Sequence, residues 1–212
     1  MYVPAHFAVP DIDALHRLMR EHPFAALVTN GASGLDANHI PFELELPPGK
    51  QGVLHGHVAR NNPVWTDVRN GDDVLVVFRA EDAYITPNWY PSKHEFKKQV
   101  PTWNYRVVHA HGKITIRDDE RYVRGVVARL TRTHESPQPK PWKMGDSPVD
   151  YIETMLKAIV GIEIEIEKIV GKFKLSQNRE LRDKRSAGEA LKAQGDVAMG
   201  QAMLDAITED PR

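Results

Sequence analysis

The chain has no cysteine among its 212 residues. This excludes disulfide bonds, thiolate nucleophiles and cysteine-ligated zinc or iron–sulfur sites, and it fits a reducing compartment. No stretch approaches the roughly 20 apolar residues that a membrane-spanning helix needs. The N-terminal segment MYVPAHFAVPD carries proline and aspartate and no long apolar run, so it is unlike a signal peptide. We therefore expect a cytoplasmic protein without a membrane segment.

An excess of charge of one sign is missing as well. The 28 Lys and Arg residues face 29 Asp and Glu residues, which gives a formal net charge of −1. No global basic field draws the chain to nucleic acid or to a membrane surface. The motifs G-x-G-x-x-G, H-E-x-x-H and G-x-S-x-G and the P-loop are also absent. The sequence thus gives no signal for the enzyme classes that these motifs mark.

Segments with strand character come in runs, and helices are inserted late in the chain. Apolar runs and turn signals predict strands over residues 24–29, 39–46, 53–58, 72–80, 83–86, 102–117 and 161–175. Amphipathic spacing predicts helices near residues 12–19, 119–130, 148–159, 178–192 and 196–207. Either Asp118 or Asp119 is expected to cap the second of these helices. A doubly wound parallel sheet needs regular alternation of strands and helices, so this order argues against it. We predict a mainly β, α+β chain.

Three local patterns give finer predictions. The strand over 39–46 is expected to form a hairpin with the strand over 53–58. The helix near 148–159 is expected to bury its apolar side: Tyr151, Ile152, Met155, Leu156 and Ile159. In 161–175 the isoleucines at 162, 164 and 166 have one parity, whereas the later apolar residues have the other. Either a bulge near residues 167–168 or a crossing of the strand between packing layers explains this slip.

The segment from Pro87 to Tyr105, PNWYPSKHEFKKQVPTWNY, holds two Trp, two Tyr and one Phe around three Lys. Flat apolar rings beside cations suit a flat anionic ligand, by stacking and charge. The alternative is that the rings fill a core or a subunit interface. A disordered segment has no use for so many rings, so we expect the segment to be ordered.

Four sequence words occur in order along the chain: MYVPAHF, GHVARNNPVW, PNWYPSK followed by QVPTWNY, and KFKLSQNR. Through these words the chain resembles the PaiB-type family of FMN-binding negative transcriptional regulators, from Met1 to about Arg179. The resemblance implies an antiparallel split β-barrel with peripheral helices, related to the pyridoxamine-phosphate oxidase flavoproteins. It also implies a homodimer with FMN at the subunit interface, and repression of gene expression. The alternative is a flavin-dependent or haem-linked oxidoreductase of the same superfamily.

The same resemblance suggests how the chain is divided. We expect residues 1–178 to form the split-barrel domain and residues 179–212 to form a helical extension packed on it. A barrel this small is not expected to bury the surplus of rings between Trp89 and Trp103 alone, which also favours a dimer.

The word HVARNNP supplies the first candidates for cofactor binding. A guanidinium is a fork of donors suited to phosphate. Residue type, place and the resemblance make His57, Ala59, Arg60 and Asn61 cofactor-binding candidates. The alternative is that Arg60 pairs with a surface carboxylate and that Asn61 caps the turn.

Further candidates come from two other segments. Asn38 and His39 are candidates for contact with the flavin ring, because the resemblance implies that their strand lies beneath it. The alternative is that His39 is an ordinary half-buried histidine. The aromatic segment adds Trp103 for the ring and Lys97 or Lys98 for the phosphate.

Two histidine pairs, His55 with His57 and His109 with His111, each have i, i+2 spacing on a predicted strand. Such pairs on neighbouring strands would offer imidazoles to zinc, iron or haem. Neither pair has an obvious carboxylate partner to orient its rings. We therefore predict structural histidines and no metal site.

One basic cluster bears on a DNA partner. Its members are Lys172, Lys174, Arg179, Arg182, Lys184 and Arg185. Glu180 and Asp183 interrupt it, and a solvated helix face explains it equally well. No helix-turn-helix is present. Charge therefore does not support DNA binding, and the choice among enzyme, sensor and repressor stays open.

Overall fold

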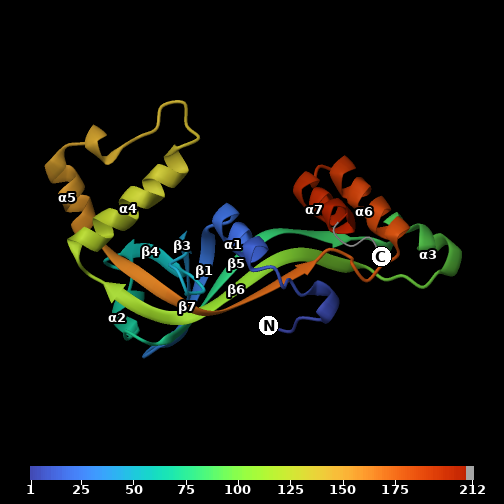
Figure 1. The fold of residues 1–212 in the computed structure, drawn as a ribbon, viewed down its shortest axis with the longest axis horizontal. Coiled ribbons are helices and arrows are strands. Elements are labelled where there is room, and N and C mark those ends of the chain that lie inside the picture. The colour runs from blue at the N-terminus through green and yellow to red at the C-terminus, as the bar shows by residue number, and fades with distance from the viewer. Residues whose placement is uncertain (209–212) are drawn as a thin grey trace. The chain divides into compact units, whose positions relative to one another are not determined.

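The computed structural model describes residues 1–208 of the chain, which divides into two compact units. Among the described residues, unit 1 consists of residues 1–15, 79–108 and 170–208, and unit 2 of residues 16–78 and 109–169. Three long strands contribute residues to both units: β5 (Asp73–Ile85), β6 (Thr102–Arg117) and β7 (Ile159–Lys174). The predicted division at residue 178 stays a prediction, and helices α6 and α7 at the C-terminus belong to unit 1 (Figure 1).

The strands form one seven-stranded antiparallel sheet in the order β2-β1-β5-β6-β7-β4-β3. The shorter strands are β1 (Phe24–Gly31), β2 (Gly34–Pro41), β3 (Glu43–Glu45) and β4 (Val53–Ala59). A Cβ added at Gly56 of β4 would lie 3.1–3.2 Å from Phe42 and Ile40, so strand β4 lies close to the end of β2. The sheet is open rather than closed. The predicted mainly β, α+β split-barrel class with peripheral helices is confirmed.

Unit 2 has a hydrophobic core to which its strands contribute buried side chains. Its fully buried side chains alternate along the strands, as one-sided burial requires: Leu27, Leu54, Phe78, Ile114, Ile162 and Ile164. Helix α1 (Ile12–Glu21) begins in unit 1 and continues into unit 2 from residue 16. The other helices of unit 2 are α2 (Val64–Asp67), α4 (Glu120–Glu135) and α5 (Val149–Lys157). Asp119 caps α4 by accepting a hydrogen bond from the Tyr122 N–H at 2.8 Å, which confirms the predicted helix start.

The predicted hairpin between the strand over 39–46 and the strand over 53–58 is confirmed for residues 43–45 and wrong for the part that carries Asn38 and His39. Strand β2 pairs with β1, so that Asn38 lies opposite Leu27 and His39 opposite Ala26. Strand β3 is the one that pairs with β4. The tight turn into Gly34, whose φ is 97°, closes the β1–β2 hairpin over a shorter loop than the alternative pairing needs.

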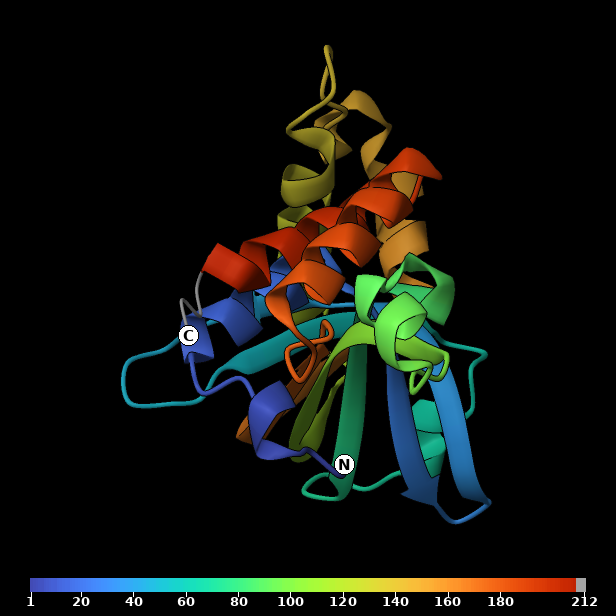
Figure 2. The ribbon, with the colours of Figure 1, turned by 90° about the vertical axis from the view of Figure 1, so that its right-hand side faces the viewer.

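Unit 1 has its own core, built around the aromatic segment. Tyr90 and Ile85 are fully buried against helices α6 (Leu181–Ala193) and α7 (Val197–Thr208). These two helices approach closely, because a Cβ on Gly200 would lie only 2.6 Å from the Gly188 carbonyl oxygen. Figure 2 shows them side by side in orange and red. Rings of the segment therefore fill a core in part, as one of the two sequence interpretations held.

The short helix α3 (Pro91–Phe96) is fastened to α6 by a buried carboxylate. Asp183 is fully buried and accepts hydrogen bonds from the Ser92 N–H at 3.0 Å and the Ser92 hydroxyl at 2.5 Å. A buried charge of this kind needs such donors. The contact orders the segment between Pro87 and Tyr105, as predicted.

The slip in β7 and the apolar face of α5 bear on two further sequence expectations. The boundary between the units falls at residues 169 and 170 of β7, where the apolar pattern slips. This agrees with a strand that passes from one packing environment to another. The expected burial of α5 was largely wrong, because Tyr151 and Met155 are 54% and 44% exposed and only Leu156 is buried. Amphipathic spacing shows which face is apolar and does not show what covers it.

No helix among residues 1–208 combines the length and apolar character needed to cross a membrane.

Candidate functional site

The HVARNNP turn of unit 2 brings two of the predicted segments together. The Asn62 side-chain amide donates to Asn38 Oδ1 at 2.7 Å, so β2 is tied to the turn that follows β4. Asn62 Oδ1 accepts from the Val64 N–H at 3.0 Å and starts α2. The Trp65 indole donates to the Arg60 carbonyl at 2.8 Å. The bridging role of Asn62 was missed, although its place beside Pro63 is a turn signal.

Arg60 is held by several acceptors of its own chain. Its two terminal nitrogens donate to Asp118 at 3.0 and 2.5 Å, and its Nε donates to the Lys157 carbonyl at 2.7 Å. The guanidinium also lies 5.7 Å from the Trp65 ring centroid. The hydrogen bonds from Arg60 hold the pKa of Asp118 below its usual range. The pairing with a surface carboxylate that the sequence left as an alternative is present, and a phosphate role for Arg60 stays a prediction.

The remaining unit 2 candidates are less engaged. Asn61 and Ala59 are exposed, and His39 is exposed with its ring 6.0 Å from that of Phe24. His57 is half-buried, and within residues 1–208 its buried Nδ1 has no hydrogen-bond partner. Burial lowers the pKa of His57, so its neutral form is favoured. An unsatisfied buried nitrogen at the end of a strand is a position that a ligand or a partner chain would complete.

Three candidates belong to unit 1. Trp103 is 54% exposed, packs edge-on to Tyr84 at 6.0 Å and lines a hollow of about 310 Å³. The other residues lining this hollow are Arg79, Asp82, Tyr105 and Val107. Lys97 ends α3 in the left-handed region with φ 54°, and Lys98 is exposed beside it. The structure therefore brings Asn38 to the HVARNNP turn within unit 2, while Trp103 and the two lysines lie in the other unit.

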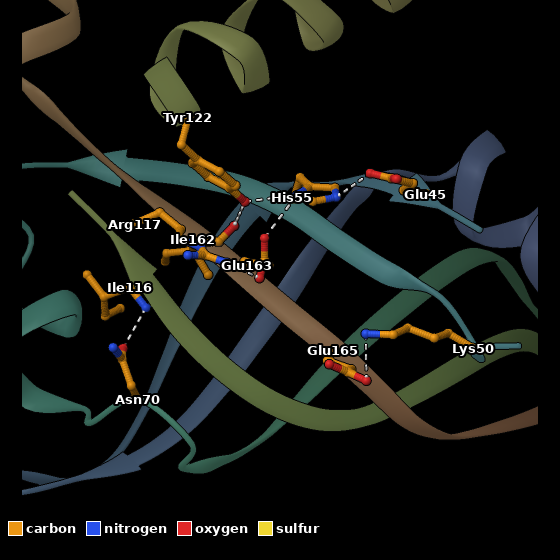
Figure 3. Close-up of polar contacts among 10 residues, drawn as sticks. All are labelled: Glu45, Lys50, His55, Asn70, Ile116, Arg117, Tyr122, Ile162, Glu163 and Glu165. Atoms are coloured by element: carbon orange, nitrogen blue, oxygen red, sulfur yellow. Dashed lines mark hydrogen bonds and ion pairs between the residues drawn. The ribbon is translucent and has the colours of Figure 1, made fainter. Parts of the chain in front are cut away.

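A polar cluster that the sequence did not reveal surrounds His55 in unit 2 (Figure 3). His55 Nε2 lies 2.9 Å from Glu45 Oε2, and its Nδ1 lies 2.8 Å from the Tyr122 hydroxyl oxygen. The Tyr122 hydroxyl also lies 3.1 Å from the Ile162 carbonyl oxygen, to which it can donate. Burial, with a smaller contribution from the positive charge of Arg129, lowers the pKa of His55. Burial likewise raises the pKa of Tyr122, which stays a neutral phenol.

Proton placement in this cluster follows from the donor count. A neutral His55 that donates from Nε2 to Glu45 has a bare Nδ1, which accepts the Tyr122 proton. An imidazolium would donate from both nitrogens and leave the Tyr122 proton for the Ile162 carbonyl. The lowered pKa favours the neutral arrangement near pH 7. Only the tertiary contact between α4 and β4 creates this cluster, because Tyr122 is 67 residues from His55.

The two histidine pairs do not meet. Strand β7 lies between β6, which carries His109 and His111, and β4, which carries His55 and His57. In the part of the chain that the structure describes, no group of three or more His, Asp or Glu side chains has metal-binding geometry. The absence of a metal remains a prediction, and Glu45 supplies the carboxylate partner that the sequence did not show for His55.

The basic cluster of the C-terminal segment is largely engaged. Arg182 pairs with Glu95 at 2.5 Å and with Glu180 at 2.8 Å. Lys184 is buried, and Lys172 lies over the rings of Tyr2 and Tyr105 at 5.7 and 5.4 Å. These cations are therefore used within unit 1.

The open antiparallel sheet with peripheral helices is a split-barrel fold. The sequence profile of the family described as "Putative FMN-binding domain" matches residues 1–168, and the chain belongs to this family. FMN is the cofactor that this assignment gives the chain.

Two relatives are similar to this chain in sequence, and one solved structure is similar to it in fold. An uncharacterized protein of Emericella nidulans is 35% identical over 212 residues, which is 84% of each chain. The protease synthase and sporulation protein PAI 2 of Bacillus subtilis is 31% identical over 191 residues, or 90% of this chain and 89% of that protein. The solved FAD and haem binding protein from Mycobacterium smegmatis shares the fold. Its TM-score is 0.54 at 15% identity, and the match covers 79% of this chain and 73% of that one.

The residues around the HVARNNP turn fit an FMN ligand. The dianionic phosphate needs donors, and the planar ring needs an approach that bulky side chains do not block. Asn61 offers an exposed amide, and the small Ala59 leaves the strand end open. The unsatisfied Nδ1 of His57 lies on the same strand face as Ala59, since the two are separated by one residue.

Proposed function

We propose that this chain is an FMN-dependent redox protein that works as a homodimer. The unsatisfied His57 Nδ1 near the end of β4, which is followed in the chain by the exposed Asn61, is the observation that carries the proposal. Several buried side-chain atoms within residues 1–208 lack a partner, and the one in the HVARNNP segment is His57 Nδ1, where a group added on binding would complete it. When bound, FMN would accept electrons from a donor and pass them on to an acceptor.

In this proposal each candidate has a defined role. Arg60 turns its fork from Asp118 to the phosphate, because a dianion attracts a guanidinium more strongly than one carboxylate does. Asn61 donates its amide to the same group. Asn38, held by Asn62, and His57 with its open Nδ1 contact the polar edge of the ring, and Ala59 lets the ring approach the backbone.

Candidates outside the turn have supporting roles in the dimer. Trp103 offers a stacking face, and Lys97 or Lys98 adds charge for the phosphate. His39 follows Asn38 on the other face of β2, where its exposed ring is available to a partner in the dimer. Apolar side chains left exposed support the homodimer, with the flavin at the subunit interface: Tyr84, Phe96, Val100, Val149, Tyr151 and Met155. A second copy is the partner that we propose for them.

The purified protein tests this proposal directly. We expect a blue-light absorption band of bound flavin and preference for FMN over riboflavin. Under anaerobic conditions NADH or NADPH should bleach that band, and oxygen should restore it. A protein that binds no flavin, or whose bound flavin is reduced by dithionite but by neither pyridine nucleotide, would contradict a redox role with these donors.

A second function, negative regulation of the PaiB type, is supported by the 31% identical Bacillus subtilis protein, whose name refers to protease synthase and sporulation. The engaged state of Arg182 and Lys184 argues against direct reading of DNA by α6. A gel-shift titration against the promoter of its own gene, at two salt concentrations, separates the two functions. Specific, salt-dependent binding would favour the regulator.

A further inference from the structure

Unit 2 contains a hollow, distinct from the Trp103 hollow of unit 1, whose lining carries an excess of positive charge. It has a volume of about 530 Å³ and is lined by His55, Arg117, Asp119, Arg121, Tyr122, Gly125 and Arg129. These residues come from β4, the end of β6 and α4. Figure 3 shows Tyr122 in contact with His55, and Arg117 paired with Glu163 close to them. Three guanidinium groups around one hollow are costly unless anions compensate them.

The carboxylates nearby do not compensate all of this charge. Glu163 pairs with Arg117 at 2.8 Å, and Glu45 is hydrogen-bonded to His55. Asp119 caps α4. Within residues 1–208, neither Arg121 nor Arg129 makes an ion pair with a carboxylate. Asp119 also lines the hollow, so three guanidinium groups are set against two carboxylates, Glu163 and Asp119, and one positive charge is left without a countercharge.

Unsatisfied donors point to the same conclusion. The Nε atoms of Arg117 and Arg129 are buried and have no hydrogen-bond partner within residues 1–208. Buried N–H groups are almost always paired, so these two lack an acceptor. A tetrahedral anion supplies several acceptor oxygens at once and matches the guanidinium fork.

Access to this point is open along α4. A Cβ built on Gly125 would meet only Arg129 Nη1, at 3.8 Å. The missing side chain thus leaves the helix surface free at the hollow. Tyr122 contributes a neutral phenol and an apolar ring to the wall of the hollow. The Arg117 guanidinium lies 5.7 Å from the centroid of that ring.

We propose that this hollow binds a phosphate group, as free phosphate or as a phosphate ester, at a site separate from the flavin. Arg60 lines a different hollow, together with Asp118 and residues of α5. Asp119 belongs to the lining of both hollows, so the two sites are neighbours but use different cations. This proposal does not depend on the proposed redox function.

The test compares two arginines of the same helix. Arg129→Gln removes one uncompensated charge from the hollow. Arg132→Gln is the matched control, because Arg132 is exposed and lines a different hollow, beside Trp142. Calorimetric titration with inorganic phosphate measures the affinity of the flavin-loaded wild type and both variants. Far-UV circular dichroism and thermal melts confirm that each variant is folded.

We expect Arg129→Gln to weaken phosphate binding about tenfold or more, because the loss of a hydrogen bond between charged groups lowers the affinity by about that factor. Arg132→Gln should leave it within about twofold. The proposal is overturned if wild type binds no phosphate at millimolar concentration, or if both variants weaken binding equally.

A second arm separates the sources of the phosphate group. Glycerol phosphate should compete with inorganic phosphate, whereas saturating FMN should not. Competition by FMN, with an equal loss of FMN affinity in Arg129→Gln, would make the hollow the flavin's phosphate site and overturn the separate site.

Discussion

The pair between Arg60 and Asp118 gives the sharpest test of the flavin site. Their side chains are 38% and 45% exposed, so the ion pair itself contributes only about 0.2–1 kcal/mol to folding. A hydrogen bond to a charged phosphate is worth about 1.5–3 kcal/mol. Arg60→Ala should therefore weaken FMN by about one to two orders of magnitude, with a small loss of stability.

The partner variant is expected to act in the opposite direction. Asp118→Asn removes the carboxylate that competes with the phosphate, so FMN should bind up to about fivefold more tightly. Riboflavin lacks the phosphate and should bind all variants almost equally. Fluorescence titration of both flavins measures these affinities. Arg69→Ala, which removes an exposed cation elsewhere in unit 2, is the control and should change neither.

The outcomes separate a phosphate role from a structural role. If Arg60→Ala and Asp118→Asn weaken FMN to the same extent, the pair only fixes the turn after β4. If Arg60→Ala has no effect while wild type still prefers FMN over riboflavin, the phosphate contacts other donors, and the reasoning is refuted.

Light scattering on a size-exclusion column should give a dimer, and a monomer throughout the micromolar range would contradict the interface proposal. Elemental analysis after chelator-free purification should find no stoichiometric metal, whereas one equivalent that is lost in a His57→Ala/His109→Ala variant would contradict the structural role of these histidines. Asp183→Ala should lower the free energy of unfolding by about 2–4 kcal/mol in urea titration, because the Ser92 donors lose their acceptor, while exposed Glu189→Ala should change little. The lowered pKa of His57 means that the unfolded chain takes up more protons below pH 6.5, so stability should fall as the pH drops from 6.5. Melting curves between pH 7.5 and 5.5 should show a smaller fall in His57→Gln, and an equal fall would exclude His57 as the cause.

Much of the secondary structure was predictable from local patterns. Strand β6 has the predicted bounds of 102–117, because alternation over sixteen residues leaves little freedom. Asp119 starts α4 as expected, since a cap needs only a neighbouring backbone N–H. The segment 72–86 was predicted as two strands and is the single strand β5. Its polar residues Glu81 and Asp82 remain in the strand by pairing with Arg106 and Arg79.

The candidate site was predictable only in part. The HVARNNP word and Asn38 were identified by residue type and resemblance. The hydrogen bond that joins them through Asn62, the pairing of Arg60 with Asp118 and the cluster around His55 were not predicted, because the partners lie 24, 58 and 67 residues apart in the chain. Charge and hydrogen-bonding chemistry say what a side chain can contact and do not say which partner arrives.

The sequence by itself determined the composition of the core strands, the helix starts, the family and hence the flavin. These depend on periodicity, capping and words of adjacent residues, which are local properties. The tertiary structure alone decided that β2 pairs with β1, that α5 leaves apolar residues exposed, and that three arginines converge on one hollow. Such outcomes depend on which surfaces pack together, and packing is a competition among distant segments that no local pattern records.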